Sequence, residues 1–186
     1  MDPLTRLQAA VDQARPVIAG TDTTAYGEQT PCDGWDVRAV INHMIGALTM
    51  FRDTAVDGQA DPSLFARDLI GADATASFDT AAKEAIAAWS APGKMDGMAN
   101  LPFGEFPAAF ALQLPAMDMV VHSWDISKAT GAPVDWNADL IADTNQFVTT
   151  TFTSAEFRGE DFKAPVPVPD DADDVSKLVA FLGRQP

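Results

Sequence analysis

The sequence contains a single cysteine, Cys32, and only two histidines, His43 and His122, among its 186 residues. One cysteine excludes an intrachain disulfide, which fits a reducing compartment. Basic residues are also scarce, since 12 Lys and Arg stand against 27 Asp and Glu and the formal net charge is -15. We therefore expect neither nucleic acid nor an anionic membrane as a partner, because both bind to basic surfaces.

Long apolar runs and common catalytic motifs are missing as well. No run approaches the roughly 20 apolar residues that a membrane-spanning helix needs, and the N-terminus has no basic segment followed by an apolar one, as a signal peptide would. We therefore expect a cytoplasmic protein. The sequence has no P-loop, no glycine-rich dinucleotide motif, no nucleophile elbow and no C-x-x-C pair. The two histidines are therefore the main candidates for catalytic or metal-ligating residues.

Apolar residues recur at helical spacing along most of the chain, and Asp or Asn precedes several of these stretches as a cap. Pro115 predicts a kink near Ala111, because its ring clashes with that carbonyl. Between the helices, residues 63–70 favour a short helical piece, and the glycines and prolines of residues 94–106 favour an extended excursion or loose hairpin. We predict an all-α four-helix bundle with this excursion and a C-terminal helix, in a single domain over residues 1–186. The expected helices are 3–19, 37–56, 74–91, 107–130, 137–153 and 172–182.

Asp118 and His122 lie four residues apart in one of the expected helices, so they share a face one turn apart. Their neighbours are apolar almost all round the helix, which predicts that the helix is buried. A buried carboxylate is costly unless it is paired or shares a cation. The pair therefore has two interpretations, a structural Asp–His contact or two ligands of one metal ion.

His43 lies on the apolar side of the helix expected over residues 37–56. Both histidines of the chain are thus predicted to face a helical interior, although a spare histidine usually lies on the surface. We therefore predict that His43, Asp118 and His122 meet across two helices and bind one divalent metal. Such a set with open positions suits zinc or non-haem iron, and nickel is a further candidate.

Asp125 follows His122 by three residues and lies close to the same face. One interpretation is a solvated carboxylate or one paired with Lys128. The other is a carboxylate that accepts a hydrogen bond from an imidazole and orients it toward the metal.

Three further residues are expected close to this site. Cys32 is a candidate fourth ligand or redox thiol, or else a small buried residue near a turn. Trp35 and Trp124 are expected to pack in the core beside the histidines. Nothing in the sequence identifies a catalytic residue beyond these candidates.

Two segments resemble the signatures of the DinB-like metal-binding family, in the branch of the mycothiol-dependent maleylpyruvate isomerase metal-binding domain. The C-terminal Phe181–Arg184 is also similar to that branch. The resemblance implies a four-helix bundle with a metal, usually zinc, at one end, and a homodimer. The matching segments are Thr30-Pro-Cys-Asp-Gly-Trp-Asp-Val-Arg38, followed by His43, and Asp118-Met-Val-Val-His-Ser-Trp-Asp-Ile126.

The family's metal ligands map onto His43, Asp118 and His122, with Asp118 in the place of a glutamate that is one methylene longer. The isomerases carry a further C-terminal domain for which this chain is too short, so we do not expect maleylpyruvate isomerisation. The resemblance implies a thiol-dependent transferase or isomerase with mycothiol as the cosubstrate. A non-enzymatic metal or small-ligand binding protein and a metal-free structural bundle are the alternatives.

Overall fold

The computed structural model describes residues 1–59, 61, 63–153, 158 and 162–186. Residues 2–135 form one compact unit, and Met1 together with residues 136–186 forms a second. The single domain expected over residues 1–186 stays a prediction, because this grouping does not say whether the two units fold separately. No helix of the described residues is long and apolar enough to cross a membrane.

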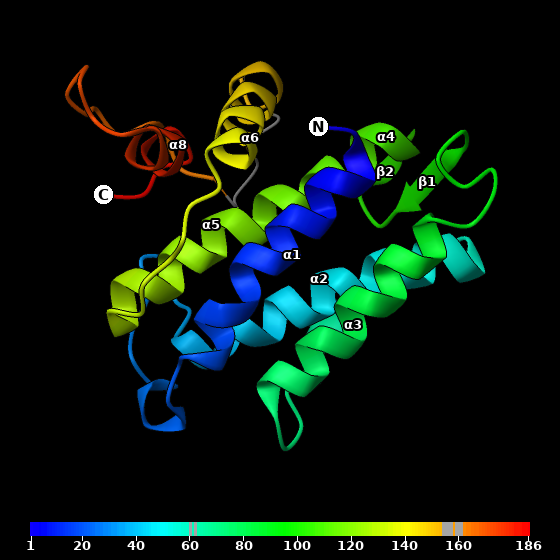
Figure 1. Cartoon of the computed structure of the whole chain (residues 1–186), viewed down its shortest axis with the longest axis horizontal. Coiled ribbons are helices and arrows are strands. Elements are labelled where there is room, and N and C mark those ends of the chain that lie inside the picture. Colours follow the sequence, from blue (N-terminus) through cyan, green and yellow to red (C-terminus); the bar gives the residue numbers. More distant parts are fainter. Residues whose placement is uncertain (60, 62, 154–157, 159–161) are drawn as a thin grey trace. The chain divides into compact units, whose positions relative to one another are not determined.

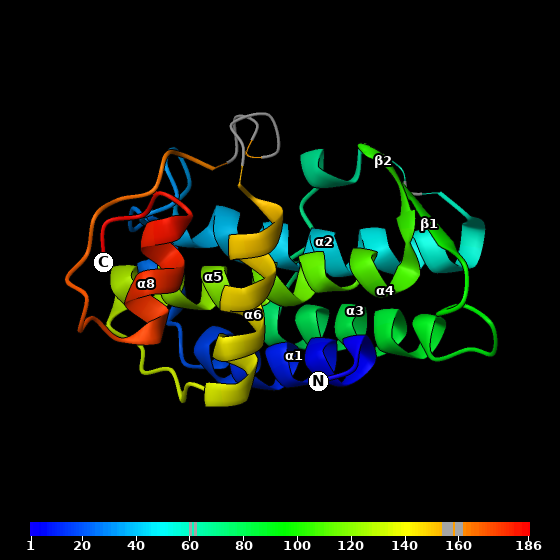
Figure 2. The same cartoon turned by 90° about the horizontal axis from the view of Figure 1, so that it is seen from above.

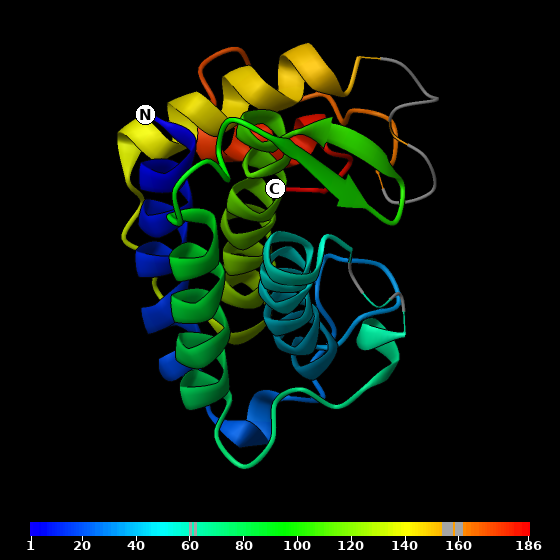
Figure 3. The ribbon, with the colours of Figure 1, turned by 90° about the vertical axis from the view of Figure 1, so that its right-hand side faces the viewer.

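The four long helices of the first unit run side by side (Figures 1 and 2). Each packs against two others, since α1 contacts α3 and α5, and α2 contacts the same two helices. Seen from another side, the four helices again lie next to one another as upright coils (Figure 3). The predicted all-α four-helix bundle is therefore confirmed. The helices are α1 (Pro3–Ala19), α2 (Val37–Asp57), α3 (Ala74–Trp89) and α5 (Gln113–Thr130).

Aspartates cap the first three of these helices, as the sequence indicated. Asp2, Asp36 and Asp73 each accept a hydrogen bond from the backbone N–H three residues further on. Such a bond satisfies one of the N–H groups that have no partner within a helix. The starts of α1, α2 and α3 coincide with the predicted starts, because the cap fixes the first turn.

The helix expected over residues 107–130 is two helices, so the prediction of one kinked helix was wrong. A short α4 (Ala108–Ala111) ends at Leu112, and α5 begins at Gln113 with Pro115 in its first turn. Proline is tolerated there because the N–H groups of a first turn have no helical partner in any case. The break falls where the steric argument placed the kink.

The connections between these four helices contain short elements of their own. A hairpin of β1 (Met98–Leu101) and β2 (Gly104–Pro107) pairs antiparallel and confirms the expected extended excursion. Single 3₁₀ turns form η1 (Thr23–Ala25) and η2 (Leu64–Ala66). The helical piece expected over residues 63–70 is thus limited to η2.

The second unit contains α6 (Ala138–Thr151) and α8 (Asp174–Phe181), which pack against each other. Arg158 joins the end of α8 to the chain that precedes this helix, since its Nη1 donates to the carbonyls of Phe181 and Lys163 at 2.8 Å each. Both helices are shorter than the predicted 137–153 and 172–182, as helix ends commonly are.

Candidate metal centre

His43 lies in the second turn of α2, and Asp118 and His122 lie in consecutive turns of α5. Because α2 and α5 pack against each other, the three side chains converge. His43 Nε2 is 3.3 Å from Asp118 Oδ1 and 3.2 Å from Oδ2. His122 Nε2 is 3.2 Å from Asp118 Oδ1. One nitrogen or oxygen atom from each residue lies within 4.8 Å of the other two.

The Asp118 carboxylate has unused acceptor capacity. Its Oδ2 atom is buried and accepts no hydrogen bond among the described residues. His43 Nε2 lies close to this atom, yet the hydrogen bond of this ring goes to Oδ1. A buried carboxylate oxygen without a hydrogen bond is costly unless a cation is bound to it.

The charges of the cluster stabilise one another strongly in the metal-free state. Burial alone would raise the pKa of Asp118, but the charges of His43 and His122 and their hydrogen bonds outweigh it and hold this pKa well below its usual range. Burial alone would lower the pKa of His122, but Asp118 and then Asp125 raise it to about 9. His122 is therefore an imidazolium at neutral pH when no metal is bound, and a metal must displace its proton.

Asp125 is completely buried, so it is not a solvated carboxylate. Its Oδ2 lies 2.9 Å from His122 Nδ1, the ring nitrogen that faces away from Asp118. The ammonium group of Lys128 lies over the ring of Trp124, 5.4 Å from its centroid. The contact between Asp125 and His122 is of the kind in which a carboxylate fixes the orientation and tautomer of an imidazole, so that its other nitrogen can bind a metal.

The turn before α2 brings Cys32 and Trp35 to the same place. Thr30 Oγ1 donates to the carbonyl of Trp35 at 2.8 Å and accepts from the N–H of Cys32 at 3.2 Å. Gly34 has a φ of 76°, which a residue with a side chain rarely adopts. The half-buried Cys32 thiol groups with His122 and Asp125, within 4.8 Å, rather than with His43 and Asp118.

Two aromatic rings border the histidines. Trp35 contacts both, with ring centroids 4.6 Å from His43 and 5.7 Å from His122. Phe65 of η2 stacks on His43 at 5.2 Å. Trp35 was expected near the site, but Phe65 was missed, because a single aromatic residue in a connection carries no periodic signal.

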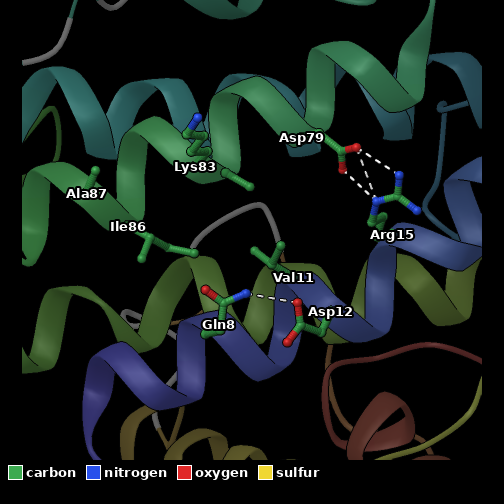
Figure 4. Close-up of a pocket in the computed structure, with 9 residues that line it drawn as sticks. Gln8, Val11, Asp12, Arg15, Asp79, Lys83, Ile86 and Ala87 are labelled. Atoms are coloured by element: carbon green, nitrogen blue, oxygen red, sulfur yellow. Dashed lines mark hydrogen bonds and ion pairs between the residues drawn. The ribbon is translucent and has the colours of Figure 1, made fainter.

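A shallow groove of about 370 Å³ lies elsewhere on the bundle, between α1 and α3 (Figure 4). Arg15 makes a two-pronged ion pair with Asp79 there, Gln8 donates to Asp12, and no residue that lines the groove has a buried polar atom without a hydrogen bond. The groove therefore has no orphaned polar group comparable to Asp118 Oδ2.

The fold and the cluster together define a class, a four-helix bundle in which facing helices contribute two imidazoles and a carboxylate. The family model of the mycothiol maleylpyruvate isomerase N-terminal domain matches residues 7–127. The chain belongs to this family.

Two uncharacterised proteins of Mycobacterium tuberculosis, from strains CDC 1551 and H37Rv, are 29% identical to the chain over 186 residues. The alignments cover 99% of this chain and 98% of each relative. These relatives therefore share the whole length of the chain, in contrast to the solved structures below.

Two crystal structures of a mycothiol-dependent maleylpyruvate isomerase, one of them a histidine-to-alanine variant, have the same fold. Their TM-scores are 0.60 for the variant and 0.58 for the other, at 16% and 15% identity. Each alignment covers 77% of this chain but only 66% of the solved chain. About a third of the isomerase chain thus has no counterpart in the alignment, and the likeness shows the DinB-like fold alone.

Proposed function

We propose that His43, Asp118 and His122 bind one divalent metal ion, with zinc as the first choice and nickel or iron as alternatives. The observation that carries the proposal is the Asp118 carboxylate, which lies between two imidazoles and has a buried Oδ2 atom without a hydrogen bond. These three residues come from two helices, and His43 precedes Asp118 by 75 positions. A structural Asp118–His122 pair would be complete without His43, so the convergence of the third residue favours a metal site.

The distances fit a metal centre. Zinc lies about 2.0–2.1 Å from histidine nitrogens and carboxylate oxygens, so two ligands at a tetrahedral angle are about 3.3–3.4 Å apart. The nitrogen–oxygen separations of 3.2–3.3 Å in the cluster are close to this value. The shorter side chain of Asp118, relative to the glutamate of the isomerases, therefore still reaches both histidines.

We further propose that the site serves a low-molecular-weight thiol of the mycothiol type, in a transferase or isomerase reaction. The bound metal would lower the pKa of a coordinated thiol, so that a thiolate forms at neutral pH. Asp118 supplies negative charge to the centre, and Asp125 holds His122 in the orientation that presents Nε2. The family name supports the thiol, and the reducing cytoplasm expected from the single cysteine would keep it reduced.

Elemental analysis of protein purified without a His tag tests the metal. About one metal ion per chain is expected in the wild type, and none in His43→Ala or His122→Ala. Asp118→Asn should also lose the metal, whereas Asp79→Asn, a matched change at the exposed Arg15 ion pair on α3, should keep it. A wild type that stays metal-free after reconstitution would leave the cluster as a structural ion pair.

Turnover is a separate question, answered with the metal-loaded protein. With mycothiol and a panel of electrophiles, thiol consumption reports a transferase and conversion of the electrophile without thiol loss reports an isomerase, for the wild type and for His122→Ala. Activity that disappears with the metal supports the thiol-dependent enzyme. Full metal occupancy without turnover of any member of the panel would favour the non-enzymatic binding protein.

A further inference from the structure

Two of the three proposed metal ligands reach solvent. The side chains of His43 and Asp118 are 25% and 20% exposed, whereas that of His122 is 6% exposed. A ligand would therefore meet His43 and Asp118 before His122, which is almost completely buried. A side chain that packs against the exposed part of His43 can therefore also contact a ligand bound at the proposed metal.

Phe65 is such a neighbour. Its ring lies against the His43 imidazole, with the two planes inclined by only 24°. The residue is 40% exposed, so part of the ring faces solvent beside an accessible ligand residue. An aromatic ring in that position is costly to expose and offers a flat apolar surface for contact.

The segment that carries Phe65 is fastened to α2 next to His43. The amide of Asn42 donates to the carbonyl of Arg67 at 3.0 Å and accepts from the N–H of Leu69 at 2.7 Å. Arg38 Nη2 is 3.0 Å from both carboxylate oxygens of Asp68. These contacts hold the segment across the outer face of α2 and fix where Phe65 lies.

Gly46 of α2 makes room for the ring. A Cβ atom at this position would lie 3.0 Å from both Cδ1 and Cε1 of Phe65 and 3.3 Å from Leu69 Cδ1. Glycine inside a helix is less favourable than alanine. The absence of a side chain at Gly46 therefore allows Phe65 to lie close to α2 and over His43.

We propose that Phe65 is a specificity-determining residue that selects metal-binding ligands with a planar apolar group, such as an aromatic ring. The inference rests on the proposed metal site and adds the class of ligand. The metal-binding head of the ligand is held at His43, Asp118 and His122, and its planar group packs on the exposed part of Phe65. The ring of Trp35 also contacts both histidine rings of the cluster.

The test uses two hydroxamates that share a metal-binding head, benzohydroxamate and acetohydroxamate, with cobalt(II)-loaded protein and its visible spectrum as the readout. The wild type should bind the phenyl compound more tightly. An aromatic pair contributes enough to change affinity about three- to tenfold. Phe65→Ala should therefore lower the ratio of the two affinities by about this factor and leave acetohydroxamate binding unchanged.

Three further variants make the result specific. Phe65→Tyr keeps a ring and should keep the ratio, whereas Gly46→Ala should lower it by displacing the ring without removing it. Phe103→Ala removes an aromatic residue that is 63% exposed at the hairpin turn, and it should leave the ratio unchanged. An unchanged ratio in cobalt-loaded Phe65→Ala overturns the inference. A wild type that binds no cobalt instead overturns the proposed metal site.

Discussion

His122 Nδ1 lies 2.9 Å from Oδ2 of Asp125, a carboxylate with no solvent exposure one turn further along α5. The opposite nitrogen of the same ring faces Asp118. One imidazole thus joins the proposed metal ligands to a buried carboxylate behind them. The relationship makes Asp125 the most informative position for mutation outside the three proposed ligands.

Replacing Asp125 should weaken metal binding without removing a ligand. Loss of a carboxylate that orients a metal-bound imidazole typically costs about 10- to 100-fold in metal affinity, and we expect Asp125→Ala to fall in this range. Asp125→Asn keeps an acceptor oxygen and should be affected less. Competition with a chromogenic chelator measures the affinities. Equal affinity in Asp125→Ala and the wild type would contradict an orienting role.

Metal removal should lower thermal stability. A metal that binds only the folded protein adds about 2.7 kcal/mol at a free concentration 100 times Kd, which corresponds to about 5–10 °C in Tm for a chain of this size. We expect a chelator to lower the Tm of the wild type by this order. His43→Ala should melt at the same temperature with and without chelator, and a shift in that variant would place the metal elsewhere.

The metal-free protein should lose stability at alkaline pH. The pKa of His122 is raised from 6.5 to about 9 in the folded state, so its contribution is fully present below pH 6.5 and is lost as the pH rises through about 9. The pKa of Asp118 is lowered, so its contribution is present at neutral pH and is lost only in strong acid. Urea unfolding in the presence of a chelator measures this, and His122→Gln should give a flatter curve over the alkaline range.

The cap of α2 should matter to the site as well as to the helix. Asp36 accepts from the N–H of Ala39 at 2.8 Å, and Asp73 makes the matching bond at the start of α3 at 3.1 Å. Removal of either cap by alanine should cost about 1 kcal/mol of unfolding free energy. Only Asp36→Ala should also weaken metal binding, because it loosens the turn that leads from Trp35 to His43. Equal metal affinity in both variants would separate the cap from the site.

The sequence predicted the helices where local chemistry decides the outcome. The aspartate caps fix the starts of α1, α2 and α3, and Pro115 locates the break in the fourth stretch. Whether that break is a kink or an interruption depends on how the chain around Leu112 packs, which a steric argument about one carbonyl does not include.

The site shows the same division between local and tertiary information. The spacing of Asp118, His122 and Asp125 indicates a shared face, but only packing reveals that Asp125 is buried and bonded to His122. Phe65 could not be predicted, since its place over His43 depends on the Asn42 contacts and on the space at Gly46. Whether the convergent residues bind a metal stays a prediction.

The 75 positions between His43 and Asp118 have a consequence for assembly. An isolated α5 can bring together Asp118, His122 and Asp125, which are close in sequence, but His43 joins them only when a long loop of chain has closed. Before closure the chain brings together two of the three proposed ligands, and after closure it brings together all three. Tight metal binding would thus follow folding and would be restricted to chains whose bundle has formed.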